Sequence, residues 1–254
     1  ELGKICTFSC KNCACNLLTN HGERGSISAT VFVEETYDMV NNELIITDSR
    51  LLSKDEVMAI GVDNFAPLSE VPMPRAATIT RGRLTITFSG VYNTSNGVSC
   101  NLTGTAHWDD SGLHTEGENY CATGEDFIGV TWSGSFTAKS HSISGKNQLG
   151  GALTIYNSDS TPNAGRVWSF KDSNPTSKYT LYAKDINLNV NISKNTLTGN
   201  GNTAEAVLKY IHTYSKVKGS ISITPGSETV AGSFSLSNTD RQWSLVCTVT
   251  NIPY

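Results

Sequence analysis

The stretch Arg83–Tyr92, RLTITFSGVY, decides the fold class of this chain. Apolar residues alternate in it with residues that carry a hydroxyl group: Leu84, Thr85, Ile86, Thr87, Phe88 and Ser89. A period of two predicts a β-strand with one buried face and one polar, solvent-facing face. The stretch Asp185–Ile192, DINLNVNI, repeats this alternation with asparagine at the polar positions. Half-buried strands of this kind are typical of antiparallel sheets.

Further stretches carry strand signals over most of the chain. We expect strands at 26–33, 43–47, 97–107, 128–138, 151–156, 166–170, 178–183, 217–224, 229–236 and 241–251. Residues 203–214 fit a helix face or a strand, and their Tyr, Ile and Thr content favours a strand. One short helix is predicted over Ser53–Ile60, because Ser53 and Glu56 form a capping box and Gly61 follows. The predicted fold is therefore all-β, an antiparallel β-sandwich or jelly-roll-like body with one short helix.

The composition favours an extracellular setting. Ser, Thr, Asn and Gly make up about two-fifths of the 254 residues, charged residues only 17%, and the formal net charge is −4. No basic run is present, which argues against a nucleic-acid or anionic-membrane partner, and no stretch of about 18 apolar residues predicts a membrane span. The chain runs from Glu1 directly into cysteines, as a processed mature chain would. We expect a secreted or cell-surface protein.

The cysteines are distributed unevenly between two parts of the chain. The seven are Cys6, Cys10, Cys13, Cys15, Cys100, Cys121 and Cys247. Four of them lie in an irregular N-terminal segment, residues 1–24, and the body spans 25–254, with a candidate subdomain boundary near 140–150. We expect disulfides, as in an oxidising compartment. Cys100 and Cys121 flank a 20-residue loop, and a bridge between them would stabilise the fold by about 3 kcal/mol.

Pairing leaves one cysteine over, because the number is odd. Cys247 is a candidate long-range partner for the N-terminal segment, and the remaining thiol stays unpaired or bonds another chain. A zinc site from the four N-terminal thiolates is an alternative, although Cys13-x-Cys15 is tight for one. The spacing of Cys6, Cys10 and Cys13 also resembles that of radical-SAM enzymes. That chemistry needs an α/β barrel, and nothing after residue 25 predicts βα units.

A second cluster of candidate ligands lies in and beside the loop after residue 106. Its members are His107, Asp109, Asp110, His114 and Glu116, with Glu118 and Asp126 farther along. Carboxylates suit calcium and imidazoles suit zinc or copper, so a divalent metal is a candidate ligand, calcium foremost. The alternative is a solvated acidic loop that binds nothing, and apart from this candidate calcium we expect no cofactor.

Two surface functions can be assigned to candidate residues. Trp108 lies among polar neighbours and is the candidate for stacking on a sugar ring. Asn-x-Ser/Thr triplets at Asn93, Asn101 and Asn191 are candidate glycosylation sites of a glycoprotein.

No catalytic motif is recognisable, and this favours a protein that is not an enzyme. Gly-x-Ser-x-Gly, His-Glu-x-x-His and a phosphate-binding glycine loop are all missing from the sequence. The sequence therefore favours a structural or adhesive protein that self-associates into a homo-oligomer or filament by edge strands and disulfides. The alternative is a secreted carbohydrate-binding, lectin-like module with a glycan ligand and calcium as a candidate cofactor. A secreted glycan-active or metal-dependent enzyme ranks third.

Overall fold

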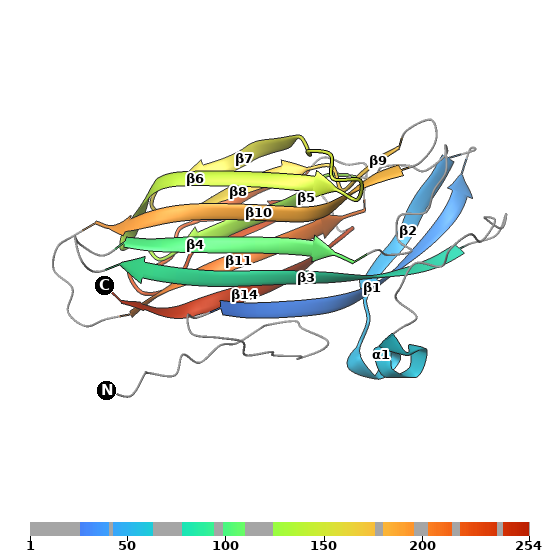
Figure 1. Ribbon diagram of the computed structural model, residues 1–254, viewed down its shortest axis with the longest axis horizontal. Helices are drawn as coiled ribbons and strands as arrows, with labels where there is room; N and C mark the ends of the chain where they lie inside the picture. Colours follow the sequence, from blue (N-terminus) through green and yellow to red (C-terminus); the bar gives the residue numbers. More distant parts are fainter. Residues whose placement is uncertain are drawn as a thin grey trace.

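The fold is a two-layer sandwich of long antiparallel strands (Figure 1). The computed structural model describes residues 26–40, 43–62, 78–93, 99–109, 124–175, 180–195, 203–214, 219–237 and 241–253. The first half of the elements is β1 (Ser26–Val40), β2 (Glu43–Leu51), α1 (Lys54–Ile60), β3 (Thr78–Asn93), β4 (Ser99–Trp108), β5 (Asp126–Trp132), β6 (Phe136–Asn147) and β7 (Ile155–Thr161). The second half is β8 (Gly165–Phe170), β9 (Ser173–Pro175), β10 (Thr180–Lys194), β11 (Thr203–Thr213), β12 (Ser220–Thr224), β13 (Ser233–Ser237) and β14 (Gln242–Pro253).

Two main sheets form the layers. The seven-stranded sheet has the order β2-β1-β3-β4-β10-β6, with β9 also paired to β10. The five-stranded sheet has the order β14-β11-β5-β8-β7, and β12 and β13 form a separate hairpin. Every pairing between these strands is antiparallel. The predicted all-β antiparallel sandwich is confirmed, and strands from both sides of residues 140–150 share each main sheet.

Alternation builds the core between the two sheets. Residues of β3 such as Ile86 and Phe88 point inward and are fully buried, as are Ile128 of β5 and Leu208 of β11. The two sheets pack closely at Gly104, where an added Cβ would lie 2.8 Å from Leu208 Cδ1. Any larger residue at 104 would therefore push the sheets apart.

The helix and the small hairpin each cover one outer face. The capping box predicted at Ser53 and Glu56 is confirmed, and Gly61 ends α1 with a φ of 86°. The helix buries Val57 against Leu52 and Phe32, and Phe32 lies on the outer face of the seven-stranded sheet. On the opposite outer face, the β12–β13 hairpin packs Phe234 and other apolar side chains onto β5, β8 and β11.

Several predicted strands differ from the observed strands in their bounds. The expected strand at 128–138 is two strands, β5 and β6, with a turn at Gly134, and β6 continues to Asn147. The strands expected at 178–183 and 185–192 are one strand, β10. The ambiguous residues 203–214 form β11, as favoured. The N-terminal segment, residues 1–24, lies outside the described residues.

Candidate functional site

A histidine lies where the core should be apolar. In β11 the inward positions are Ala204, Ala206, Leu208 and Tyr210, and the next one is His212. The His212 side chain is only 3% exposed. Its ring lies 4.9 Å from the ring of Trp243, measured between centroids. Because a buried imidazole needs hydrogen-bond partners, the surrounding strands must supply them.

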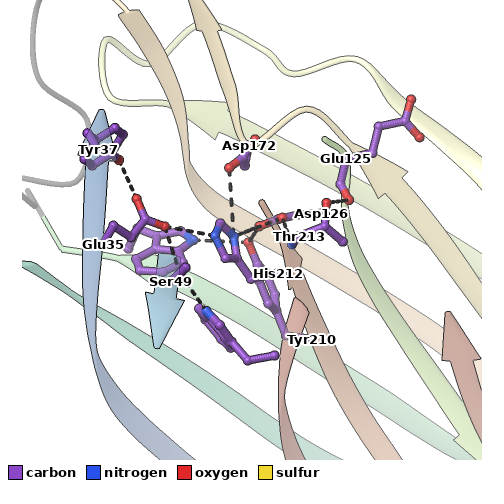
Figure 2. Close-up of polar contacts among 11 residues, drawn as sticks. Glu35, Tyr37, Ser49, Glu125, Asp126, Asp172, Tyr210, His212 and Thr213 are labelled. Atoms are coloured by element: carbon purple, nitrogen blue, oxygen red, sulfur yellow. Dashed lines mark hydrogen bonds and ion pairs between the residues drawn. The ribbon is translucent and has the colours of Figure 1, made fainter. Parts of the chain in front are cut away.

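Three carboxylates surround this imidazole (Figure 2). Nε2 lies 3.0 Å from Oε1 of Glu35 in β1, and Nδ1 lies 3.1 Å from Oδ2 of Asp126 in β5. Oδ2 of Asp172, just before β9, lies 3.9 Å from the same Nδ1. We call Glu35, Asp126, Asp172 and His212 the His212 cluster; all four are buried.

The charge of His212 follows from these neighbours. Burial alone would lower its pKa, but the carboxylates of Asp126 and Glu35 outweigh burial and raise the pKa well above its ordinary value. In the absence of a bound ion, the imidazole is therefore a buried cation at neutral pH, hydrogen-bonded through both ring nitrogens.

Hydroxyl groups hold the carboxylate of Glu35 in place. Tyr37 OH donates to Oε2 and Ser49 Oγ donates to Oε1 at 3.1 Å. Ser49 in turn accepts from Trp243 Nε1 at 3.0 Å. Glu35 is thus bonded by strands of both sheets, because Ser49 belongs to β2 and His212 to β11.

The carboxylate of Asp126 is held in a similar way. Thr213 donates its backbone N–H to Oδ1 at 3.0 Å, and Tyr210 OH donates to Oδ2. Tyr210 OH also accepts from Trp108 Nε1 at 3.1 Å. Burial and the neighbouring Asp126 carboxylate raise the pKa of Tyr210 well above its ordinary value, which keeps the phenol protonated as a donor.

The His212 cluster has the donor set of a metal site. One ligand atom each from Asp126, Asp172 and His212 lies within 4.8 Å of the other two. In the part of the chain that the structure describes, this is the one such group of three.

The predicted loop cluster is brought together in part. His107 and Asp109 lie on the outer face of the seven-stranded sheet, where His107 Nε2 is 3.3 Å from Asp109 Oδ1. His107 Nδ1 is 2.6 Å from Oδ1 of Asp185, which the sequence did not single out, and Arg83 pairs with Asp109. These side chains form a half-exposed group of polar contacts. Asp110, His114, Glu116 and Glu118 lie outside the described residues, and Asp126 belongs to the His212 cluster.

Trp108 does not have the exposure that sugar stacking requires. It ends β4 as an inward residue, is 3% exposed, and donates to Tyr210. The polar neighbours in the sequence suggested an exposed ring, but the alternation of β4 continues through residue 108 and turns the indole into the core. A stacking platform needs an open ring face, so this expectation is corrected.

Cys100 and Cys247, the two described cysteines, are buried free thiols. This differs from the expectation that both form disulfides. Burial raises the pKa of each to about 12, so neither is a thiolate at neutral pH. Cys6, Cys10, Cys13, Cys15 and Cys121 lie outside the described residues.

Two candidate glycosylation sites are direct neighbours. Asn101 in β4 and Asn191 in β10 are paired across the two strands on the outer face, and Asn93 ends β3. The Cβ atoms of directly paired residues such as these lie only about 5 Å apart. Glycosylation at the three positions stays a prediction.

Two members of the His212 cluster could have been recognised from the sequence, because they occupy inward positions of alternating strands. Glu35 continues the inward positions Ala29, Val31 and Val33 of β1, as His212 does in β11. A charged residue in an otherwise apolar alternation marks a buried polar site. Asp172 lies between strands and offers no such pattern.

Comparison with known proteins gives no family. No protein-family model and no curated protein sequence matches the chain. A solved structure titled "pH-induced modulation of Streptococcus parasanguinis adhesion by Fap1 fimbriae" is similar at 11% identity and a TM-score of 0.29. The match covers 89% of this chain and 96% of that one. No helix among the described residues is long and apolar enough to cross a membrane.

Proposed function

We propose that this chain is an extracellular or cell-surface structural or adhesive protein that self-associates through the outer face of its seven-stranded sheet. The observation that carries the proposal is an array of uncharged polar side chains on that face. Two rows cross the strands β1, β3, β4, β10 and β6, and a third crosses β3, β4, β10 and β6 and includes one apolar residue, Val91. They consist of Ser28, Thr87, Thr105, Asn187 and Ser144; Ser26, Ser89, Thr103, Asn189 and Ser142; and Val91, Asn101, Asn191 and Ser140. We call these rows the hydroxyl–amide array.

Chemically, the array is complementary to itself. Each hydroxyl or amide both donates and accepts hydrogen bonds, so two copies of the face can pair without matching charges. Some of these groups already bond within the sheet: Ser28 with Thr87 at 2.8 Å, and Asn189 with Thr103 at 3.3 Å. His107 and Asp185 lie in the adjoining row, so the three rows themselves contain no charged side chain.

The size of the array sets the strength of the contact. Strands about 4.8 Å apart and rows about 6.8 Å apart give a face of roughly 480 Å² per copy. Stable interfaces bury about 800 Å² per partner, so a single contact of this kind is weak. Lasting adhesion then requires many copies acting together, as on a surface or in a fibre.

The carbohydrate-binding alternative has less support. Its predicted stacking residue, Trp108, is buried, and a polar array without an exposed aromatic ring binds sugars weakly. Binding on a glycan array, lost in a variant of the hydroxyl–amide array, would favour this alternative over self-association.

Sedimentation velocity over a wide concentration range tests the proposal. We expect the wild-type weight-average sedimentation coefficient to rise between about 10 μM and 1 mM, as for a weak contact. Asn187→Lys places a cation on an exposed position of the array and should abolish the rise. Ser158→Lys, on an exposed position of β7 in the other sheet, is the matched control and should behave as wild type. A wild-type protein that stays monomeric, or an Asn187→Lys variant that associates as wild type does, would overturn the proposal.

A further inference from the structure

We propose that Asp126, Asp172 and His212 bind a divalent transition-metal ion of the zinc type in the interior of the sandwich. This site is separate from the hydroxyl–amide array, which lies on the outer face of the seven-stranded sheet. The inference is independent of the proposed function.

The distances between donor atoms suit such an ion. Zinc binds imidazole nitrogen at about 2.0–2.1 Å and carboxylate oxygen at about 2.0–2.2 Å, so its tetrahedral ligands lie roughly 3.3 Å apart. His212 Nδ1 lies 3.1 Å from Asp126 Oδ1 and 3.9 Å from Asp172 Oδ2. All three donor atoms fall within 4.8 Å of one another. Small side-chain rotations are therefore enough to bring them around one ion.

The second nitrogen of His212 has the partner that metal-bound histidines use. A metal-ligating histidine usually donates its other ring N–H to a carboxylate, which orients the ring. Nε2 lies 3.0 Å from Glu35 Oε1, and this places Nδ1 toward Asp126 and Asp172. Glu35 is itself held by Tyr37 and Ser49, so the ring orientation is set before an ion arrives (Figure 2).

The carboxylate of Asp126 is also oriented in advance. Tyr210 OH and the backbone N–H of Thr213 donate to its two oxygens, one to each. Each oxygen keeps a lone pair for an ion, because a carboxylate oxygen accepts more than one bond. Hydrogen-bonded carboxylates of this kind are the usual outer contacts of built metal sites.

The donor set selects the class of metal. One imidazole nitrogen and two carboxylates suit zinc, cobalt, iron or manganese. Calcium takes six to eight oxygen ligands, and this cluster offers imidazole nitrogen and too few oxygens. The site therefore differs in metal from the calcium-binding loop that the sequence suggested near His107, and it shares only Asp126 with that predicted cluster.

Cobalt is the probe for this site, because Co²⁺ replaces zinc and absorbs visible light. The full chain is stripped with EDTA, unfolded and refolded with increasing Co²⁺, since a buried site fills most readily during folding. We expect one Co²⁺ per chain, with X-ray absorption showing nitrogen and oxygen ligands. No saturable binding would overturn the proposal, as would sulfur ligands, which would assign the ion to the N-terminal cysteines.

Variants then locate the ion. Asp172→Asn removes one ligand and should weaken Co²⁺ binding at least tenfold, and Glu35→Gln should weaken it by about 10–100-fold through the ring of His212. His107→Gln is the matched control, because His107 also contacts two carboxylates but lies on the outer face. The His107→Gln variant should bind Co²⁺ with the affinity of the wild type. Loss of binding in His107→Gln, with retention in Asp172→Asn, would overturn the assignment.

Discussion

Replacing Glu35 with glutamine is the sharpest test of the electrostatics of the core. The carboxylate accepts from His212, Ser49 and Tyr37, and its residue is 2% exposed. Glutamine keeps the size but loses the charge, and it turns one acceptor oxygen into a donor NH₂ group. At least one of the three donors then faces another donor, and the buried imidazolium loses a counter-charge.

The expected cost follows from that geometry. Breaking a buried ion pair by removing one partner destabilises a protein by about 3–5 kcal/mol. Whole domains are stable by only about 5–15 kcal/mol, so the variant would lose a large share of its stability. The double variant Glu35→Gln/His212→Gln should cost clearly less than the sum of the two single variants, because it removes the stranded charge as well.

Urea unfolding at pH 7 with EDTA, followed by tryptophan fluorescence, measures the effect. Glu228→Gln is the matched control: it makes the same chemical change on an exposed side chain and should shift the free energy of unfolding by less than about 0.5 kcal/mol. A Glu35→Gln variant within about 1 kcal/mol of wild type would refute the reasoning, because such a cost is that of an exposed ion pair.

Two further predictions concern titration. The folded pKa of His212 is raised by Asp126 and Glu35 against the effect of burial, so its stabilisation is complete below about pH 6.5 and declines as pH rises through the folded pKa. Urea midpoints in EDTA should therefore fall from pH 6.5 to 9, less so in Glu35→Gln; a wild-type midpoint that rises would contradict this. Cys100 and Cys247, whose pKa values are about 12, should resist iodoacetamide at pH 8 in the folded protein and react fully in guanidinium without reductant. Peptide mass spectrometry reads both states, and protection that persists in guanidinium would show that the cysteines are in disulfides.

Local pattern predicted the strands that have one buried face. Arg83–Tyr92 and Asp185–Ile192 alternate because the core takes every second side chain, and both lie within strands of the predicted kind. Residues 139–147 of β6 were not predicted as a strand. β6 is an edge strand whose residues 139–142 are exposed on both faces, so no apolar period marks it. β7, the edge of the other sheet, is exposed in the same way.

The alternation of residues in the sequence could not predict the candidate site, and the reason is different. Glu35 and His212 are 177 residues apart, and their contact depends on how two sheets stack. The alternation of β1 and β11 shows that each residue points inward, but it does not show that they meet. Trp108 illustrates the opposite error, since its polar neighbour His107 lies on the other face of the same strand.

The position of the His212 cluster links it to strand register. Glu35, Ser49, Asp126, His212 and Trp243 come from five strands of two sheets, β1, β2, β5, β11 and β14. A slip of two residues in β1 would keep its polar residues on the outer face but would move the Glu35 carboxylate away from His212 and Ser49. The Ser/Thr-rich outer faces tolerate such a slip, because one hydroxyl replaces another at little cost. The cluster therefore supplies the register specificity that the polar surface lacks, and it does so with or without a bound ion.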